Sequence, residues 1–191
     1  MIPHCDELFL RYLDPWYDDS DRARRGFAAT RLDMLTLDTI SESPLNQETQ
    51  EEVAHRIQTM FNAAQSDWSS QFSLTGDPDL HWIETIDKHY DRAQIKDLIG
   101  RSDPEDFSND YLIVCCEFGA LLGHVLKKLK PRLQWHYEWP YWESDLRDPK
   151  TNNIIPPFHW AVKKMSEYGV DDLFWEKVPA CVSMLDRKTE V

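Results

Sequence analysis

Apolar residues return at helical spacing along most of this chain. The longest run extends from residue 46 to residue 72, with apolar positions three or four residues apart: Val53, Ile57, Met60, Phe61, Ala64, Trp68 and Phe72. This period is typical of an amphipathic helix that buries one face. Asn46 is a suitable N-cap, and Glu48, Glu51 and Glu52 are favourable near the positive end of the helix dipole. One long helix is therefore predicted here.

Shorter helices are predicted on either side of this one. They cover residues 6–13, 79–90 and 94–99, and Gly100 is expected to end the last of them. Pro3, Pro15 and Pro44 interrupt the first 45 residues, which favours short helices joined by turns.

A second long helix is predicted from Ser108, with Phe107 as a hydrophobic staple, to Pro131, which stops it. Its core face follows the helical period and comprises Tyr111, Val114, Phe118, Leu121, Val125 and Leu129. Gly119 and Gly123 lie inside this helix at a cost of about 1 kcal/mol each relative to alanine. Because a close crossing by another element would explain that cost, we assign both glycines to packing.

The apolar period changes from helical to alternating after residue 132. Leu133, Trp135, Tyr137 and Trp139 alternate with polar residues and a proline, which predicts a strand with one aromatic face. A second extended piece is predicted at 141–146, and turn residues at 148–153 lead to a short strand at 154–155.

Two helices are predicted after the strands. One starts at Pro156 and Pro157 and ends at Gly169, and the other, near Phe174, is interrupted by Pro179. The fold class is therefore α+β: helix-rich, with about six helices and a small antiparallel sheet of two to three strands in the C-terminal half. The length of 191 residues suits one domain over 1–191, with an acidic helical part (1–110) and a second part (111–191).

Charge is distributed unevenly between these two parts. Residues 1–110 contain 23 Asp and Glu against 10 Lys and Arg, whereas residues 111–191 contain 11 of each kind. An acidic surface repels nucleic-acid phosphates and steers basic partners toward itself. We therefore expect no nucleic-acid binding and a protein partner of basic character. The alternative is that the acidity only keeps the domain soluble.

The cysteines and the apolar runs bear on the compartment. Cys115 and Cys116 lie in an apolar run and no cysteine pair has C-x-x-C spacing, which predicts buried thiols in a reducing compartment. The first residues lack the basic and apolar regions of a signal peptide. The apolar stretch 111–126 is shorter than the roughly 20 residues of a membrane span. These features predict a cytoplasmic protein that does not interact with membranes.

No familiar catalytic motif occurs in the chain, so neither a cofactor nor a metal site is predicted. An enzyme of unfamiliar type remains an alternative. Glu117 and His124 are seven residues apart on one helical face, and together with His136 they are weak candidates for an acid–base site between the long helix and the sheet. The competing interpretation is a structural hydrogen bond at the edge of the core.

The segment 135–145 interleaves aromatic and acidic residues. Alternation predicts that Trp135, Tyr137 and Trp139 share a buried face, which leaves Trp142, Glu143 and Asp145 as the exposed group. Exposed Trp and Tyr side chains are common in binding sites. A small-ligand or carbohydrate site that uses Trp139, Tyr141 and Trp142 is therefore a further alternative.

Three segments of the C-terminal half suggest a resemblance: 118–126, 135–137, and 155–158 leading into Lys163 and Lys164. In these roughly 60 residues the chain loosely resembles small bacterial α+β domains without an assigned activity, some of which occur among immunity proteins of toxin systems. The resemblance implies a bacterial cytoplasmic protein and carries no functional residues. Together with the regional charge, it favours a non-catalytic, acidic protein-interaction module, such as an inhibitor or immunity protein that blocks a basic partner.

Such a module would use two groups of residues. Acidic side chains would steer the encounter, and aromatic side chains would slow dissociation. The candidate binding residues are Glu48, Glu51, Glu52, Trp139, Tyr141, Trp142, Glu143 and Asp145.

Overall fold

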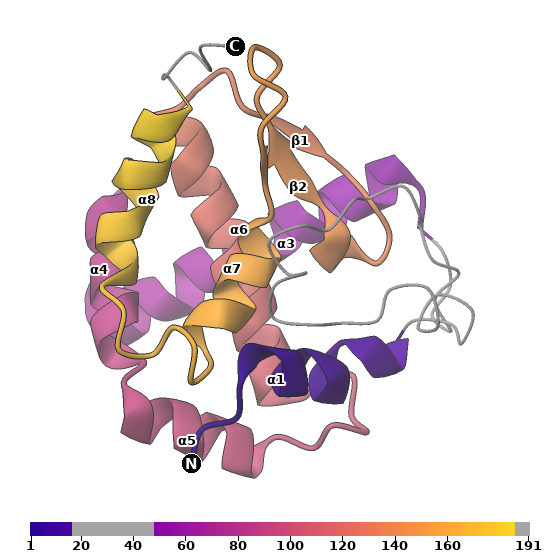
Figure 1. The fold of residues 1–191 in the computed structure, drawn as a ribbon, viewed down its shortest axis with the longest axis vertical. Helices are drawn as coiled ribbons and strands as arrows, with labels where there is room; N and C mark the ends of the chain where they lie inside the picture. Colours follow the sequence, from indigo (N-terminus) through magenta and orange to yellow (C-terminus); the bar gives the residue numbers. More distant parts are fainter. Residues whose placement is uncertain (17–47, 186–191) are drawn as a thin grey trace.

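Helix α6 (Asp110–Leu129) lies at the centre of the molecule, with α7 in front of it and α3 behind it in Figure 1. The structure, a computed structural model, describes residues 1–16 and 48–185. Helix α6 buries residues on nearly every side because it is apolar around most of its circumference. Leu129, predicted to be buried, is instead exposed at its last position.

The N-terminal elements surround one end and one side of α6 (Figure 1). They are α1 (Cys5–Tyr12), the 3-10 turn η1 (Asp14–Trp16), α3 (Gln50–Phe72), α4 (Leu80–His89) and α5 (Arg92–Arg101). Asp79 and Asp91 cap α4 and α5 by accepting hydrogen bonds from backbone N–H groups of the first turn.

Three predicted helix boundaries, those at the start of α3, the end of α5 and the start of α6, were wrong. Helix α3 is capped by Thr49, which forms a reciprocal capping box with Glu52; the predicted cap, Asn46, lies outside the described residues. Helix α5 continues through Gly100 to Arg101. Gly100 does not adopt the positive φ of a helix-ending glycine, so the helix is not interrupted there. Helix α6 starts at Asp110, capped by Asn109 and not by the predicted Ser108.

Three short strands form an antiparallel sheet in the order β1-β2-β3. They are β1 (Gln134–His136), β2 (Asp145–Arg147) and β3 (Ile154–Ile155), with Trp135 opposite Leu146 and Arg147 opposite Ile154. The predicted strand 133–139 is shorter than expected. Its continuation passes through the cis peptide Trp139–Pro140 into a 3-10 turn, η3 (Tyr141–Glu143).

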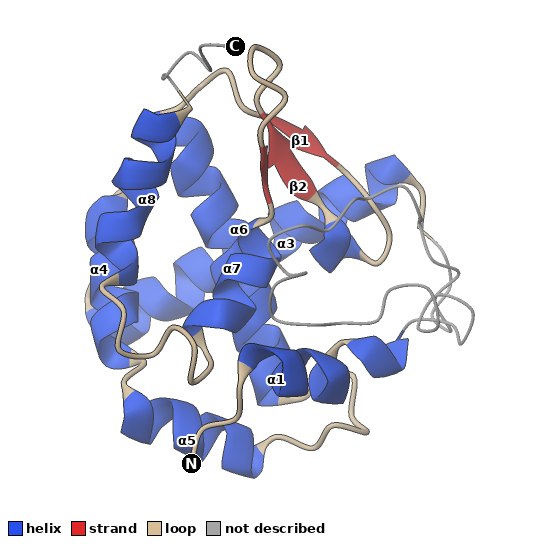
Figure 2. Cartoon of the chain, viewed as in Figure 1, coloured by secondary structure: helices blue, strands red, loops and turns tan. Residues whose placement is uncertain are grey.

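The chain ends in two helices, α7 (Pro157–Lys164) and α8 (Phe174–Met184). Helix α7 ends before the predicted Gly169. Helix α8 passes through Pro179, which lies on its exposed side and costs it one backbone hydrogen bond. Helices α8 and α4 contact each other on one side of α6, and the sheet lies near the opposite side (Figures 1 and 2).

Both interior glycines of α6 are contact points, as predicted. A Cβ atom on Gly119 would lie 2.5 Å from the Phe158 ring, and one on Gly123 would lie 2.2 Å from the Trp135 ring. The absence of side chains at these positions thus allows α7 and β1 to approach α6. The structure confirms the predicted fold class: helix-rich α+β, with a three-stranded antiparallel sheet in the C-terminal half. Within residues 1–16 and 48–185, no helix has the length and apolar character that crossing a membrane requires.

Candidate functional sites

The aromatic residues that were expected to contact a ligand lie in the core. Trp139, Tyr141 and Trp142 are 3%, 5% and 0% exposed. The turn η3 folds this segment onto the protein, where Tyr141 packs edge-on against Phe158. The expectation that Trp142 is exposed was therefore wrong, and these three side chains do not form an open binding surface.

Glu143 and Asp145 are also buried, against expectation, at 3% and 0% exposure. Asp145 accepts a hydrogen bond from the Arg147 guanidinium, which also contacts His136 Nδ1 at 2.7 Å. Burial raises the pKa of Asp145, and Arg147 opposes that rise. Burial, followed by Arg147, lowers the pKa of His136. Pairing with Arg147 within the sheet thus explains how the Asp145 carboxylate can occupy the interior.

A buried histidine lies beside this group. His159 of α7 is 1% exposed, its Nε2 is 3.6 Å from Glu143 Oε2, and its ring packs against Phe9. A distance of 3.6 Å is longer than a hydrogen bond, so the two side chains are close without sharing one. His159 thus lies between α1, which carries Phe9, and η3, which carries Glu143. The sequence analysis did not identify His159 as a candidate.

Glu117 is half-buried on α6 and forms no hydrogen bond or ion pair with His124 in the described parts of the chain. Burial, followed by the nearby Asp67 of α3, raises the pKa of Glu117 from 4.5 to about 7. His124 instead donates a hydrogen bond from Nε2 to Asp77 Oδ1 at 3.0 Å, and Lys128 Nζ lies 2.7 Å from Asp77 Oδ2. Asp77 comes from the turn before α4 and was not among the predicted residues.

The predicted catalytic group therefore does not assemble as proposed. No hydrogen bond or ion pair joins Glu117, His124 and His136 in the part of the chain that the structure describes. Each of the three has a different charged neighbour: Asp67, Asp77 and Arg147, respectively. Helical spacing placed Glu117 and His124 on similar sides of α6, but side chains from other elements determine their contacts.

The three glutamates at the start of α3 have different environments. Glu48 binds the Arg56 guanidinium through both carboxylate oxygens, and Arg56 in turn lies over the Tyr141 ring. Glu52 belongs to the capping box, and hydrogen bonds from Thr49 lower its pKa. Glu51 is exposed. All three border a shallow surface hollow together with His55. Of the three, Glu51 is the one that takes part in neither the ion pair with Arg56 nor the capping box.

A more exposed acidic surface lies where α5 leads into α6. We call it the acidic corner; it comprises Asp97, Asp103, Glu105, Asp106 and Asp110, all of them exposed. Asp103 and Asp106 accept hydrogen bonds from the backbone N–H groups of Glu105 and Ser108 and so shape the connecting turns. Arg101 is close to two corner carboxylates, at 4.0 Å from Asp97 and 3.1 Å from Asp110. The sequence signal was the regional charge, which did not locate this corner.

One group of adjacent residues has donor atoms close enough to share a metal ion. His4, Cys5 and Asp6 each offer one atom within 4.8 Å of the others, and this is the one such group within residues 1–16 and 48–185. Burial, followed by Asp6, raises the pKa of the Cys5 thiol to about 11. A thiol that keeps its proton is a poor ligand, because metals bind the thiolate. The chemistry of this group therefore does not favour a metal site.

The chain was compared with protein-family models, with characterised proteins and with solved structures, and none of the three comparisons found a match.

Proposed function

We propose that this protein is a non-catalytic interaction module that binds a basic protein partner through its acidic corner. The observation that carries the proposal is the concentration of exposed carboxylates between Asp97 and Asp110, on a turn shaped by their own hydrogen bonds. A pre-shaped anionic surface lowers the ordering cost of binding and increases the rate of encounter with cations.

The charge of the corner is only partly neutralised within the protein. Arg101 contacts Asp97 and Asp110, but the Glu105 side chain takes part in no ion pair in the described parts of the chain. Ile113, which follows Asp110 by one helical turn, is 40% exposed. An apolar side chain beside charged ones supports binding, since charges steer the encounter while desolvated apolar contacts slow dissociation.

The finer proposal is an inhibitor or immunity protein that covers a basic active surface of its target in the bacterial cytoplasm. It is supported by the regional acidity and by the resemblance of segments 118–126, 135–137 and 155–158 to domains of that kind. A target encoded beside the gene for this protein would add independent support.

Matched charge reversals test the docking proposal. The full chain and its Glu105→Lys variant are immobilised, and the proteins that each captures from a bacterial lysate are compared. Glu176→Lys on α8 is the control, because it changes the net charge by the same amount at an exposed position outside the acidic corner. We expect the corner variant, and not the control, to lose one basic protein. That protein is then purified, and its association rate with the wild-type chain is measured between low and high salt.

The expected association rate falls steeply as salt rises, because screening shortens the reach of the corner's charge. A second variant, Glu51→Lys, tests whether the partner binds at the start of α3 instead. If the acidic corner is the binding surface, this variant should retain the partner. If Glu105→Lys and Glu176→Lys retain the same proteins, or if the association rate does not change with salt, docking at the acidic corner is wrong.

A further inference from the structure

A cleft of about 440 Å³ lies between α3, α6 and β1, away from the residues of the acidic corner. Its size is that of a site for one small molecule. Polar side chains from both helices, from the residue that follows β1 and from the turn before α4 converge on it: Gln58, Asp77, His124, Lys127, Lys128 and Tyr137. A cleft with convergent polar groups from four parts of the chain is suited to recognise a ligand of defined shape.

The β1 side of the cleft carries two stacked aromatic rings. The rings of Trp135 and Tyr137 are almost parallel, with an interplanar angle of 16° and centroids 6.0 Å apart. Both are half-buried, and contact with Gly123 of α6 fixes the position of the Trp135 ring. The partly exposed surface of this aromatic pair is one that the apolar face of a ring compound can contact.

Helix α6 contributes an oriented imidazole to the cleft. Asp77 bridges His124 and Lys128, and the Phe61 ring stacks on His124 with 4.2 Å between centroids. Lys128, followed by His124, holds the pKa of the Asp77 carboxyl below its ordinary value, so this partner stays anionic. When the neutral ring donates Nε2–H to Asp77, Nδ1 becomes a hydrogen-bond acceptor. Nδ1 has no hydrogen-bond partner in the described part of the chain.

The second lysine of the cleft supplies a positive charge. Asp77 is already paired with Lys128, at 2.7 Å. Lys127 borders the same cleft and forms no ion pair within residues 1–16 and 48–185. The cleft therefore offers one cation for an anionic group, in a protein whose net charge is −13.

We propose that this cleft binds an acidic sugar, that is, a hydroxylated ring bearing one carboxylate or phosphate. The ring would lie on Trp135 and Tyr137, a hydroxyl group would donate a hydrogen bond to His124 Nδ1, and the anion would bind Lys127. The many polar groups that line the cleft favour a hydroxylated ring over a purely aromatic acid, because an aromatic acid would leave those groups without hydrogen-bond partners.

Calorimetric titration of the full chain tests this site with four probes: D-glucuronate, D-glucose 6-phosphate, D-glucose and 4-hydroxybenzoate. We expect saturable binding of at least one of the two acidic sugars, at least about tenfold tighter than binding of glucose, the difference that one charge-assisted contact provides. The stronger of the two identifies the anion as carboxylate or phosphate. In NMR spectra, binding should also shift the indole N–H signal of Trp135. This signal is assigned by its absence from the spectrum of Trp135→Phe.

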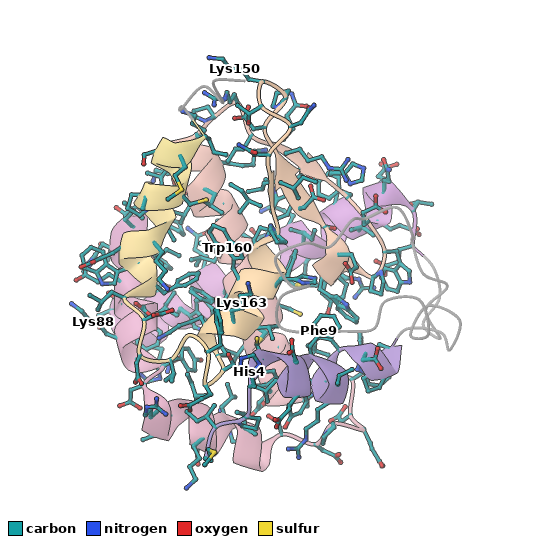
Figure 3. The ribbon with its side chains drawn as sticks, viewed as in Figure 1. His4, Phe9, Lys88, Lys150, Trp160 and Lys163 are labelled. Atoms are coloured by element: carbon teal, nitrogen blue, oxygen red, sulfur yellow. The ribbon has the colours of Figure 1, made fainter. Side chains whose placement is uncertain are left out.

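The matched variants are Lys127→Gln in the cleft and Lys150→Gln at the tip of the β2–β3 connection, which Figure 3 shows at the edge of the molecule. Lys127→Gln should weaken acidic-sugar binding about tenfold and leave glucose unchanged, whereas Lys150→Gln should match the wild type. The proposal is overturned if neither acidic sugar binds, if 4-hydroxybenzoate binds more tightly than both, or if the two variants behave alike. None of these results bears on the acidic corner, so the two proposals can fail separately.

Discussion

Lys164 and Asp87 form an ion pair in the interior of the protein, with Lys164 Nζ 2.5 Å from Asp87 Oδ1 and side chains 2% and 4% exposed. The pair joins α7 to α4. Asp87 also accepts a hydrogen bond from the backbone N–H of Trp175 at the start of α8, and Lys164 donates one to the Val170 carbonyl. These polar contacts thus tie α4 to α7 and to the start of α8, which follow it in the sequence by about 70 residues or more.

Removing one partner of this pair is expected to destabilise the fold strongly. In Lys164→Met the Asp87 carboxylate would stay buried without its cation, which costs about 3–5 kcal/mol of unfolding free energy. The double variant Asp87→Leu with Lys164→Met should recover much of that loss, since it leaves no buried charge behind. Urea unfolding followed by circular dichroism measures both.

The exposed pair Lys88–Glu84 on α4 is the control for this prediction. Its atoms are 2.6 Å apart, but Lys88, at the outer edge of the molecule in Figure 3, is 67% exposed. Glu84→Gln should therefore change the unfolding free energy by no more than about 0.5 kcal/mol. A similar loss in Lys164→Met and Glu84→Gln would show that the buried pair contributes no more than a surface one.

Two glycines in helices should respond to alanine in opposite directions. Gly123→Ala places a methyl group 2.2 Å from the Trp135 ring, so the ring must move, whereas a methyl group on Gly100 meets nothing within 4 Å. We expect Gly123→Ala to lose about 1–3 kcal/mol of unfolding free energy through overpacking. Gly100→Ala should gain about 0.5–1 kcal/mol through helix propensity. Thermal unfolding compares them; a Gly123→Ala variant as stable as the wild type would contradict the packing role of Gly123, and a loss in Gly100→Ala would contradict the propensity argument.

The helices of this fold could be predicted from the sequence because their apolar period is local information. The predicted helices around α3 and α6 match the structure closely, and the error lies in which polar residue acts as the cap. Asn46 and Thr49, or Ser108 and Asn109, are comparable caps by residue type. The choice between them depends on where the backbone turns, and that is set by packing against the rest of the protein.

The environment of the aromatic segment could not be predicted in the same way. Alternation implies one buried and one exposed face, but η3 replaces the expected strand after Pro140 and both sides of the segment become buried. Burial of Asp145 depends on Arg147 and that of Glu143 on a layer that includes His159 of α7. Similarly, His124 was a candidate, yet its partner Asp77 is 47 positions away in the sequence. Such contacts are properties of the tertiary structure.

Thiol reactivity should distinguish Cys181 from the other three cysteines. All four are free; Cys5, Cys115 and Cys116 are buried, and Cys181 is only partly so. Burial raises the pKa of Cys116 to about 12 and that of Cys115 well above its ordinary value, so neither forms thiolate near neutral pH. We expect a disulfide reagent to modify Cys181 slowly in the native protein and all four thiols in denaturant. Mass spectrometry of labelled peptides identifies the site; early labelling of Cys115 would contradict this order.

Glu117 should make the stability of the protein depend on pH. Burial, then Asp67, raises its pKa from 4.5 to about 7 in the folded state, so between these values the folded protein holds a proton that the unfolded chain has lost. The unfolded state then binds fewer protons, and the unfolding free energy falls as the pH rises through this range. Glu117→Gln removes this titration, so its stability relative to the wild type should increase from pH 5 to pH 7.5. Urea unfolding at several pH values measures the difference, with Glu176→Gln on the exposed side of α8 as the control. Parallel profiles for wild type and Glu117→Gln would show that Glu117 keeps an ordinary pKa, because a carboxyl group that titrates alike in both states cannot change their free-energy difference.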